Sequence, residues 1–172
     1  MPMNLDPSAW AYAFPMVRAG GVFIFIMGAG VVLGALVPKR RRSLLVLAAA
    51  VATIAMIFSA SHLSAPYGAP TKLQLWFLFG SIGAEAIFIR VAVALYRHAS
   101  ERSLLLAILF AVGLHFLPMG MAFGPLCTAL GLMLCLCAGI GLWLMPGIPL
   151  NTLWASDGLI KMIFGATMLL AY

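Results

Sequence analysis

Six long apolar stretches make up most of this chain, and they restrict its fold more than any other feature. A helix that crosses a bilayer needs about 20 apolar residues and satisfies its own backbone hydrogen bonds. We expect Asn151 or Thr152 to cap the last of these helices. The sequence therefore predicts an all-α, polytopic integral membrane protein, with residues 1–172 forming a single transmembrane domain. Its compact bundle of six transmembrane helices would span residues 17–38, 44–61, 73–96, 104–123, 126–145 and 153–172.

The charge content agrees with burial in lipid rather than in water. Only 8% of the residues are charged, whereas a soluble domain carries about a quarter. The net charge of +6 does not indicate a nucleic-acid partner, because it comes largely from one run, Lys39, Arg40, Arg41 and Arg42. This run follows the first apolar stretch, whereas a cleavable signal peptide has its positive charge in front. We therefore expect the first stretch to be retained as a span and the lipid bilayer to be the main partner.

The positions of lysine and arginine in the short loops predict the orientation. The run at residues 39–42 lies between the first two spans, and Arg97 and Arg102 lie between the third and fourth. Positive loops stay on the cytoplasmic side, so we expect both loops there, with the basic run near the lipid headgroups and both termini outside. Aromatic residues near the span ends are typical of the membrane interface; these are Trp10, Tyr12, Tyr67, Trp76, Trp143, Trp154 and Tyr172.

Pairs of small residues four positions apart predict close helix contacts. They occur at Gly30 and Gly34, at Gly80 and Ala84, and at Gly120 and Gly124. Small residues let two membrane helices approach closely. We favour packing within the molecule, and a homo-oligomer is the second interpretation. No sequence repeat is visible, although six helices leave an inverted three-plus-three arrangement open.

Five ionisable residues lie within or at the ends of spans: Glu85, Arg90, His115, Asp157 and Lys161. A charged side chain at the middle of the membrane costs about 2.5–3.5 kcal/mol, so these groups need partners or water. At about 1.5 Å of rise per residue, they fall in overlapping layers of the inner and central membrane. Their charges balance, and one acid and one lysine lie four residues apart on the same helix face. We therefore predict a buried cluster that joins the third and sixth spans, with each basic side chain near an acid and the histidine above them.

These residues have both a structural and a functional interpretation. Paired charges can simply hold helices together, and long basic side chains can reach the headgroups. Both interpretations remain open for Arg90, Asp157 and Lys161. Glu85 and His115 lie deeper, and we favour a functional role for them, because ionisable groups inside a membrane commonly mark functional sites.

The stretch GLHFLPMGMAFGP, residues 113–125, places a histidine beside a helix-breaking residue. Pro118 lacks an N–H and clashes with the carbonyl of residue 114, which predicts a helix kink next to His115. The histidine, a serine or threonine on a neighbouring helix, or a water molecule could satisfy the freed carbonyl. The site is then either a kinked helix with a hydrogen-bonded core histidine, or a protonatable group that lines a cavity.

Metal and enzyme sites have weak support in the sequence. His115 and Met119 lie four residues apart, and soft sulfur ligands suit Cu(I), but no dense ligand motif occurs and most methionines are expected to pack. The odd number of cysteines, Cys127, Cys135 and Cys137, does not indicate a disulfide framework. No GxSxG or HExxH motif is present. We therefore expect no metal, no cofactor, no catalytic residues and no enzymatic activity.

The segment HFLPMGMAFGP, followed further along by DGLIKMIFG, resembles small multi-span bacterial membrane proteins of unknown function. His115, Pro118, Asp157 and Lys161 carry the resemblance, which covers residues 113–165. It implies a multi-pass protein of the bacterial inner membrane and supplies no activity.

Two functions are compatible with these features. The first is passage or coupled transport of a small solute or proton along a polar pathway, formed by Glu85, Arg90, His115, Asp157 and Lys161. The second is a non-catalytic membrane module that binds a partner protein or lipid, with the run at residues 39–42 touching anionic headgroups. Transport needs a cavity that reaches the charged residues, whereas a scaffold needs none.

Overall fold

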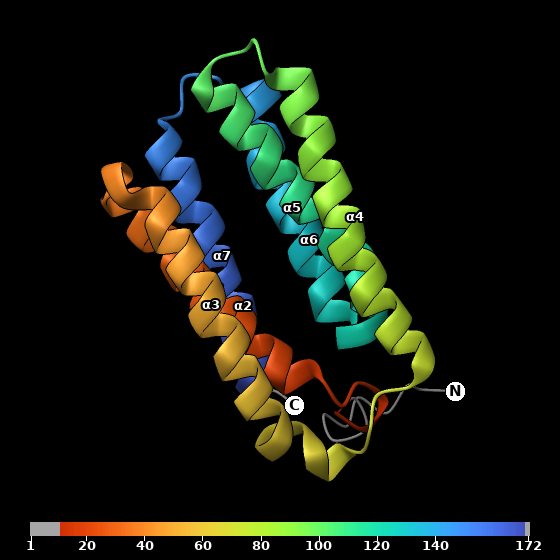
Figure 1. Ribbon diagram of the computed structural model, residues 1–172. Helices are drawn as coiled ribbons and strands as arrows, with labels where there is room; N and C mark the ends of the chain where they lie inside the picture. The colour runs from red at the N-terminus through yellow and green to blue at the C-terminus, as the bar shows by residue number, and fades with distance from the viewer. Residues whose placement is uncertain (1–10, 171–172) are drawn as a thin grey trace.

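The computed structural model describes residues 11–170, and most of them form six long helices (Figure 1). All six are long and apolar enough to cross a membrane, which confirms the predicted all-α bundle of membrane helices. Trp10 and Tyr172, expected at the membrane interface, lie outside the described residues. The helices are α2 (Val17–Leu36), α3 (Arg41–Ser59), α4 (Lys72–Tyr96), α5 (Glu101–Phe123), α6 (Pro125–Gly139) and α7 (Leu150–Leu170). Short π-helical turns continue α3 over Ala60–Ser64 and α6 over Ile140–Leu144.

Local sequence signals explain where several helices begin and end. Thr71 and Gln74 form a capping box at the start of α4, in which each side chain accepts a hydrogen bond from the backbone N–H of the other. Ser100 caps α5 by accepting from the N–H of Ser103 at 3.1 Å. Gly124, with a φ of 92°, ends α5, and a proline in the first position begins α6. The two antiparallel helices are thus joined by a very tight connection.

The helices form two layers that do not follow the order of the chain. In one layer α2 packs against both α3 and α7, and in the other α5 packs against both α4 and α6 (Figure 1). The principal contact between the layers is that of α6 with α7. Helix α7 returns to pack beside α2. The two layers therefore do not consist of the first three and the last three helices.

The backbones of α2 and α7 touch along a seam of glycines. A Cβ atom on Gly28 would lie 2.6 Å from the carbonyl oxygen of Gly158, and one on Gly165 would lie 2.6 Å from the backbone nitrogen of Phe25. Gly21 faces the carbonyl of Gly165 in the same way. In each helix the two seam glycines are separated by seven residues, which is about two helical turns.

The close contacts predicted for pairs of small residues four positions apart are found at two of the three pairs. Gly30 faces Ala48 of α3, and Gly120 faces Thr128 of α6, so both lie at close contacts within the molecule. Gly80, in contrast, has no described heavy atom within 4 Å of where its Cβ would be, so the contact within the molecule expected there is wrong, and a contact in a homo-oligomer stays a prediction. Its helix, α4, is one of the two least buried.

Two apolar clusters hold the layers together near the two ends of the bundle. We call these ends the Val17 end and the Leu36 end, after the first and last residues of α2. The buried cluster toward the Val17 end contains Val17, Ile24, Phe116, Met119, Ala122, Phe123, Cys127, Leu130, Leu134 and Met168. The cluster toward the Leu36 end contains Val31, Ala35, Leu106, Leu109, Ala138, Leu153 and Trp154. Apolar side chains therefore pack between the layers toward both ends of the bundle.

The aromatic residues expected at the interface fall into two groups. Trp76 and Trp143 are 77% and 60% exposed at the surface of the bundle, as expected of residues at a membrane interface. Trp154 is only 2% exposed and belongs to the buried cluster at the Leu36 end. Its assignment to the membrane interface is therefore wrong.

Candidate functional site

Three ionisable side chains from three different helices line a cavity between the two layers. They are Glu85 of α4, His115 of α5 and Lys161 of α7. At about 1.5 Å of rise per residue, each lies within about 5 Å of the middle of its helix. The cavity has a volume of about 330 Å³. These groups therefore lie near the middle of the membrane, where a charged side chain has the highest free-energy cost.

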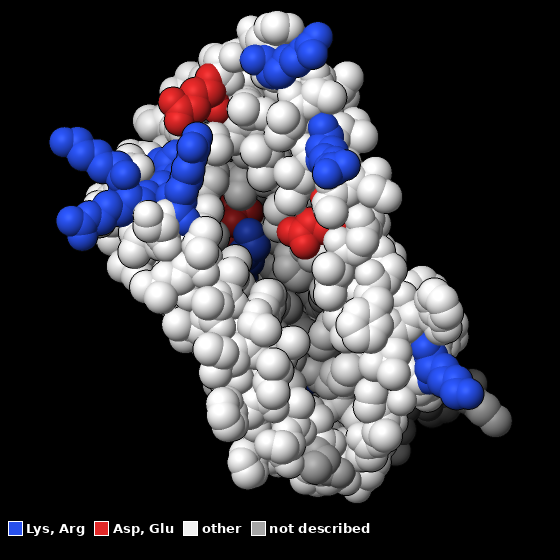
Figure 2. Space-filling model, viewed as in Figure 1, with Lys and Arg blue, Asp and Glu red and all other residues white. Residues whose placement is uncertain are grey.

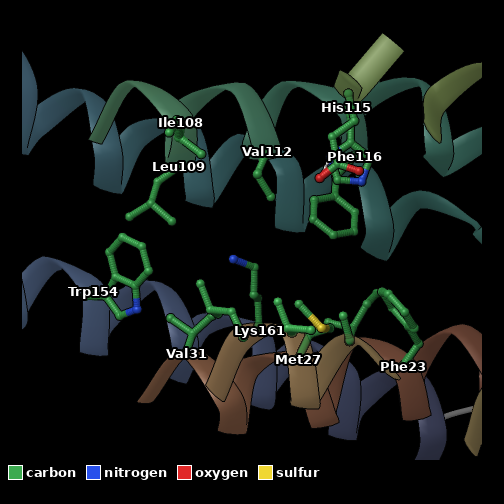
Figure 3. A pocket seen from close by; sticks show the side chains of 15 residues that line it. Phe23, Met27, Val31, Ile108, Leu109, Val112, His115, Phe116, Trp154 and Lys161 are labelled. Carbon is green, nitrogen blue, oxygen red and sulfur yellow. Dashed lines mark ion pairs between the residues drawn. The ribbon is translucent and has the colours of Figure 1, made fainter. Parts of the chain in front are cut away.

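The rest of the cavity wall is apolar. Figure 3 shows Lys161 extending from the layer of α2 and α7 toward α5, which contributes His115 and Phe116 to the opposite wall. The other lining residues are Phe23, Ile24, Met27, Val31, Leu45, Val46, Ala49, Ile108, Leu109, Val112 and Trp154. The site thus combines a few polar groups with a large apolar surface, as small-molecule sites commonly do.

A second cavity of about 270 Å³ adjoins the first toward the Val17 end. The two share Glu85, His115, Phe23, Ile24 and Phe116 in their walls. The carboxylate and the imidazole therefore lie where the two spaces meet.

The space that holds these charges opens toward the side of the bundle. Figure 2 shows a hollow between α3 and α4, with acidic and basic side chains inside it. Leu45, Val46 and Ala49 of α3 line one edge, and Glu85 comes from α4. Because α3 and α4 are membrane-length helices, this opening faces the bilayer rather than the loops.

Among residues 11–170, two pairs of opposite charge lie in this region. Lys161 Nζ donates a hydrogen bond to Asp157 Oδ2 on the same helix, and both side chains are buried. His115 Nδ1 lies 3.8 Å from Glu85 Oε1, and this contact becomes ionic only when the imidazole is protonated. His115 Nδ1 and Asp157 Oδ1 are both buried and have no hydrogen-bond partner within the described part of the chain.

The predicted cluster therefore forms, but with different pairings. Lys161 has one of the acid partners predicted for it, Asp157 of the same helix. The expected ion pair between the third and sixth spans is wrong, because Glu85 lies next to His115 of α5. The expected acid partner for Arg90 is also wrong: Arg90 is exposed and makes no ion pair with any residue of the described range. Five residues at about 100° each place it some 140° around α4 from Glu85, so it faces a different direction.

The surroundings of Pro118 include a threonine on a neighbouring helix, one of the predicted partners, although it contacts the carbonyl of Leu117 rather than that of residue 114. Helix α5 is continuous from Glu101 to Phe123, and the proline lies inside it. The Thr128 hydroxyl of α6 donates to the carbonyl of Leu117 at 3.3 Å, so a neighbouring helix supplies a polar contact beside the proline. His115 lines the cavity, and its Nδ1 has no hydrogen-bond partner in the described structure. Its role as a protonatable group stays a prediction. The kink at Pro118 stays a prediction.

Arg41 differs from the other residues of the basic run. Its Nε donates to the carbonyl of Gly34 at 3.2 Å, and a terminal nitrogen donates to Asn151 Oδ1 at 2.6 Å. Its guanidinium also lies 4.5 Å from the centre of the Trp154 ring. Arg41 thus ties together α2, α3 and α7, whereas Lys39, Arg40 and Arg42 are exposed and available to headgroups.

Sequence reasoning missed the contact between Arg41 and Trp154. The cap expected at Asn151 or Thr152 is wrong too, because α7 begins at Leu150 and the Asn151 side chain instead accepts the hydrogen bond from Arg41. The sequence signal for this contact was an arginine at the start of one span and an aromatic residue in the first turns of another. Such a signal becomes specific only when the two helices are known to be neighbours.

The cysteines in the described chain are free and do not line either cavity. Cys135 Sγ contacts the carbonyl of Phe110 on α5, and Cys137 Sγ contacts that of Leu153 on α7. Residues two apart on a helix face different directions, as expected. Over residues 11–170, no three histidine, cysteine or acidic side chains come together in a way that could hold a metal ion.

Six membrane-length helices around a cavity with three ionisable side chains define the class: a multi-pass α-helical membrane protein with an intramembrane pocket. The chain belongs to a family of unknown function, DUF6609, whose model matches residues 8–172. No curated protein and no solved structure matches the chain. The chemistry of the cavity is therefore the basis for assigning a function.

Proposed function

We propose that this protein binds a small solute or a proton in the cavity between its two layers and passes it across the membrane. The observation that carries the proposal is the meeting of Glu85, His115 and Lys161 at one cavity in the middle of the helices. Charges that only hold helices together would be expected to be packed on all sides. Here a cavity of about 330 Å³ adjoins these side chains, and its volume is within the range of ligand pockets.

The two-layer architecture supports movement around this cavity. The layers contact each other mainly through α6 and α7 and through the two apolar clusters. Transporters commonly bind their solute near the middle of the bilayer and expose it alternately by rocking one group of helices against another. Separation of the cluster at one end at a time would open the cavity to one side of the membrane and then to the other.

The residues have separate parts in this proposal. Glu85 and His115 contact the solute or carry the proton, Lys161 contributes a positive charge, and Asp157 holds that lysine in place. Arg90 is left out of the pathway because it does not line the cavity. The proposal includes no catalytic reaction and no cofactor. It places the protein in a bacterial inner membrane with the Leu36 end in the cytoplasm, as supported by the resemblance and by the positive loops.

Flux into liposomes that contain the purified protein tests the proposal. Uptake of protons, common ions and a panel of small solutes would be measured from about pH 5.5 to about pH 8, the range in which histidine titrates. We expect His115→Gln to lose the pH dependence seen in the wild type, because glutamine keeps hydrogen bonding but does not titrate there. Arg90→Gln is the matched control in the same membrane region, and it should behave as the wild type.

Two outcomes would contradict the proposal in different ways. Identical pH profiles for the wild type and His115→Gln would remove His115 from the mechanism. A lack of flux for every tested species would favour the alternative, a non-catalytic membrane module that binds a partner protein or lipid.

A further inference from the structure

The charges at the cavity do not cancel when His115 is neutral. Lys161 is paired with Asp157, which leaves the carboxylate of Glu85. No lysine or arginine of the described chain lies within 4 Å of that carboxylate, and its ionisable neighbour at this distance is the imidazole of His115. The lining residues from α2 and α3 include no titratable group, and α6 contributes no residue to either cavity wall. One negative charge therefore lacks a permanent counter-charge.

The wall around this carboxylate favours a positive group on an apolar body. Phe23 and Phe116 line both cavities, and aromatic faces attract cations. The Glu85 side chain is 30% exposed, whereas that of His115 is 6% exposed. Glu85 is thus the acidic group that an incoming molecule can reach.

The route to the site favours a molecule that partitions into lipid. The cavity opens between α3 and α4, toward the bilayer (Figure 2), and apart from Glu85, His115 and Lys161 its lining residues are apolar. A strongly hydrated ion would not reach this opening from the side. A molecule with an apolar body and a single charged group would reach it, because its apolar body partitions into lipid.

Building on the proposed function, we infer that the solute is an organic cation with an apolar body, which enters from the bilayer between α3 and α4 and is held at Glu85 in place of a proton. In the empty site, one proton shared by Glu85 and His115 balances the negative charge. When the cation binds, that proton leaves to water, so one positive charge enters as one departs. Binding should therefore weaken as the pH falls.

Three small probes of similar size and different charge test this inference. They are phenyltrimethylammonium, uncharged tert-butylbenzene of the same shape, and benzenesulfonate. Binding to the full-length protein in lipid nanodiscs is measured by titration calorimetry, with empty nanodiscs as the blank. We expect the cation to bind at least about tenfold more tightly than either of the others, a preference of about 1.4 kcal/mol. Titrations in two buffers of different ionisation enthalpy should show that protons are released.

Variants identify the group responsible for this preference. Glu85→Gln should lose the preference for the cation, because it removes the charge and keeps the shape. Glu85→Asp should retain it, and circular dichroism of both variants checks that the helices remain folded. Glu101→Gln, which alters an exposed acid at the start of α5, is the matched control and should bind as the wild type.

Several results would overturn the inference. A preference for tert-butylbenzene or benzenesulfonate would show a ligand site of another class and leave the proposed transport function standing. A preference for the cation that persists in a folded Glu85→Gln variant would place its binding elsewhere. If none of the probes binds above the blank, the cation inference fails, and the flux measurement with protons and other solutes decides the proposed function separately.

Discussion

At the scale of single residues, the pair of Asp157 and Lys161 is the strongest electrostatic contact of the site. Both side chains are buried, and they lie on one face of α7. Removing one partner leaves the other charge unpaired in an apolar setting, which costs more than removing both. The pair therefore stabilises the fold through mutual neutralisation rather than through either charge alone.

We predict that Asp157→Asn lowers the free energy of unfolding by about 3 kcal/mol, and that adding Lys161→Met restores at least half of the loss. Reversible unfolding in detergent micelles, followed by circular dichroism, would measure both effects. Glu101→Gln, at an exposed acid, should stay within about 0.5 kcal/mol of the wild type. Additive losses for the two substitutions in α7 would mean that the charges do not stabilise each other.

Arg41 makes contacts at the Leu36 end that a lysine cannot reproduce. A guanidinium can donate to two acceptors and stack on an aromatic ring at once, whereas an ammonium group is a compact point charge. We predict that Arg41→Lys destabilises the protein by about 1–2 kcal/mol through lost hydrogen bonds and stacking on Trp154. Arg40→Lys, an exposed neighbour in the same run, is the control and should be neutral in the same unfolding measurement. Equal effects for the two would show that the contacts of Arg41 contribute no stability.

At the scale of helices, the contact between α2 and α7 depends on the absence of side chains. A Cβ atom on Gly28 would lie within 2.6–2.9 Å of two backbone atoms and a Cβ atom of α7. Backbone atoms cannot move aside as the end of a flexible side chain can. The two helices would have to separate, and the cavity between the layers would change with them.

We predict that Gly28→Ala destabilises the protein by about 1–3 kcal/mol, which is the usual cost of overpacking. Gly80→Ala is the matched control in α4, where nothing described lies within 4 Å, and it should stay within about 0.5 kcal/mol of the wild type. Unfolding in micelles and the affinity of the probes for the cavity would be measured for both variants. If Gly28→Ala is as stable as Gly80→Ala, close packing is not what holds α2 against α7.

At the scale of the whole molecule, the order of the helices fixes which loops share a side of the membrane. The basic run and the loop with Arg97 and Arg102 both lie at the Leu36 end, consistent with one cytoplasmic face. The ends of α3 and α7 and the start of α4 lie at the Val17 end. The orientation of the bundle follows as soon as one end is assigned.

We predict that residues 39–43 and 97–103 are cytoplasmic and that Tyr172 is outside. Single cysteines introduced at Arg40 and His98, in a variant without native cysteines, should react in intact cells only with a membrane-permeant reagent. A cysteine at the exposed Ser61 should react with an impermeant one. Labelling of position 40 by the impermeant reagent would invert the topology.

The sequence by itself determined the class, the helices and the identity of the polar residues. Apolar stretches of membrane length allow one type of backbone, because each crossing must satisfy its own hydrogen bonds. For the same reason Glu85, His115, Asp157 and Lys161 could be selected as residues of interest, since their burial in apolar spans is costly wherever the spans lie.

Only the tertiary structure decided which residues meet. The return of α7 to α2 brings the glycines of one helix against the backbone of the other, and it places Lys161 opposite His115. The same packing leaves Arg90 and Gly80 without the neighbours predicted for them, and it buries Trp154 beneath Arg41. The physical reason is that periodicity gives the direction of each side chain around its own helix, whereas a partner also depends on which helix lies on that side and how it is rotated. Lipid tails are as apolar as the helix surfaces, so the hydrophobic pattern does not distinguish a face that contacts protein from a face that contacts lipid.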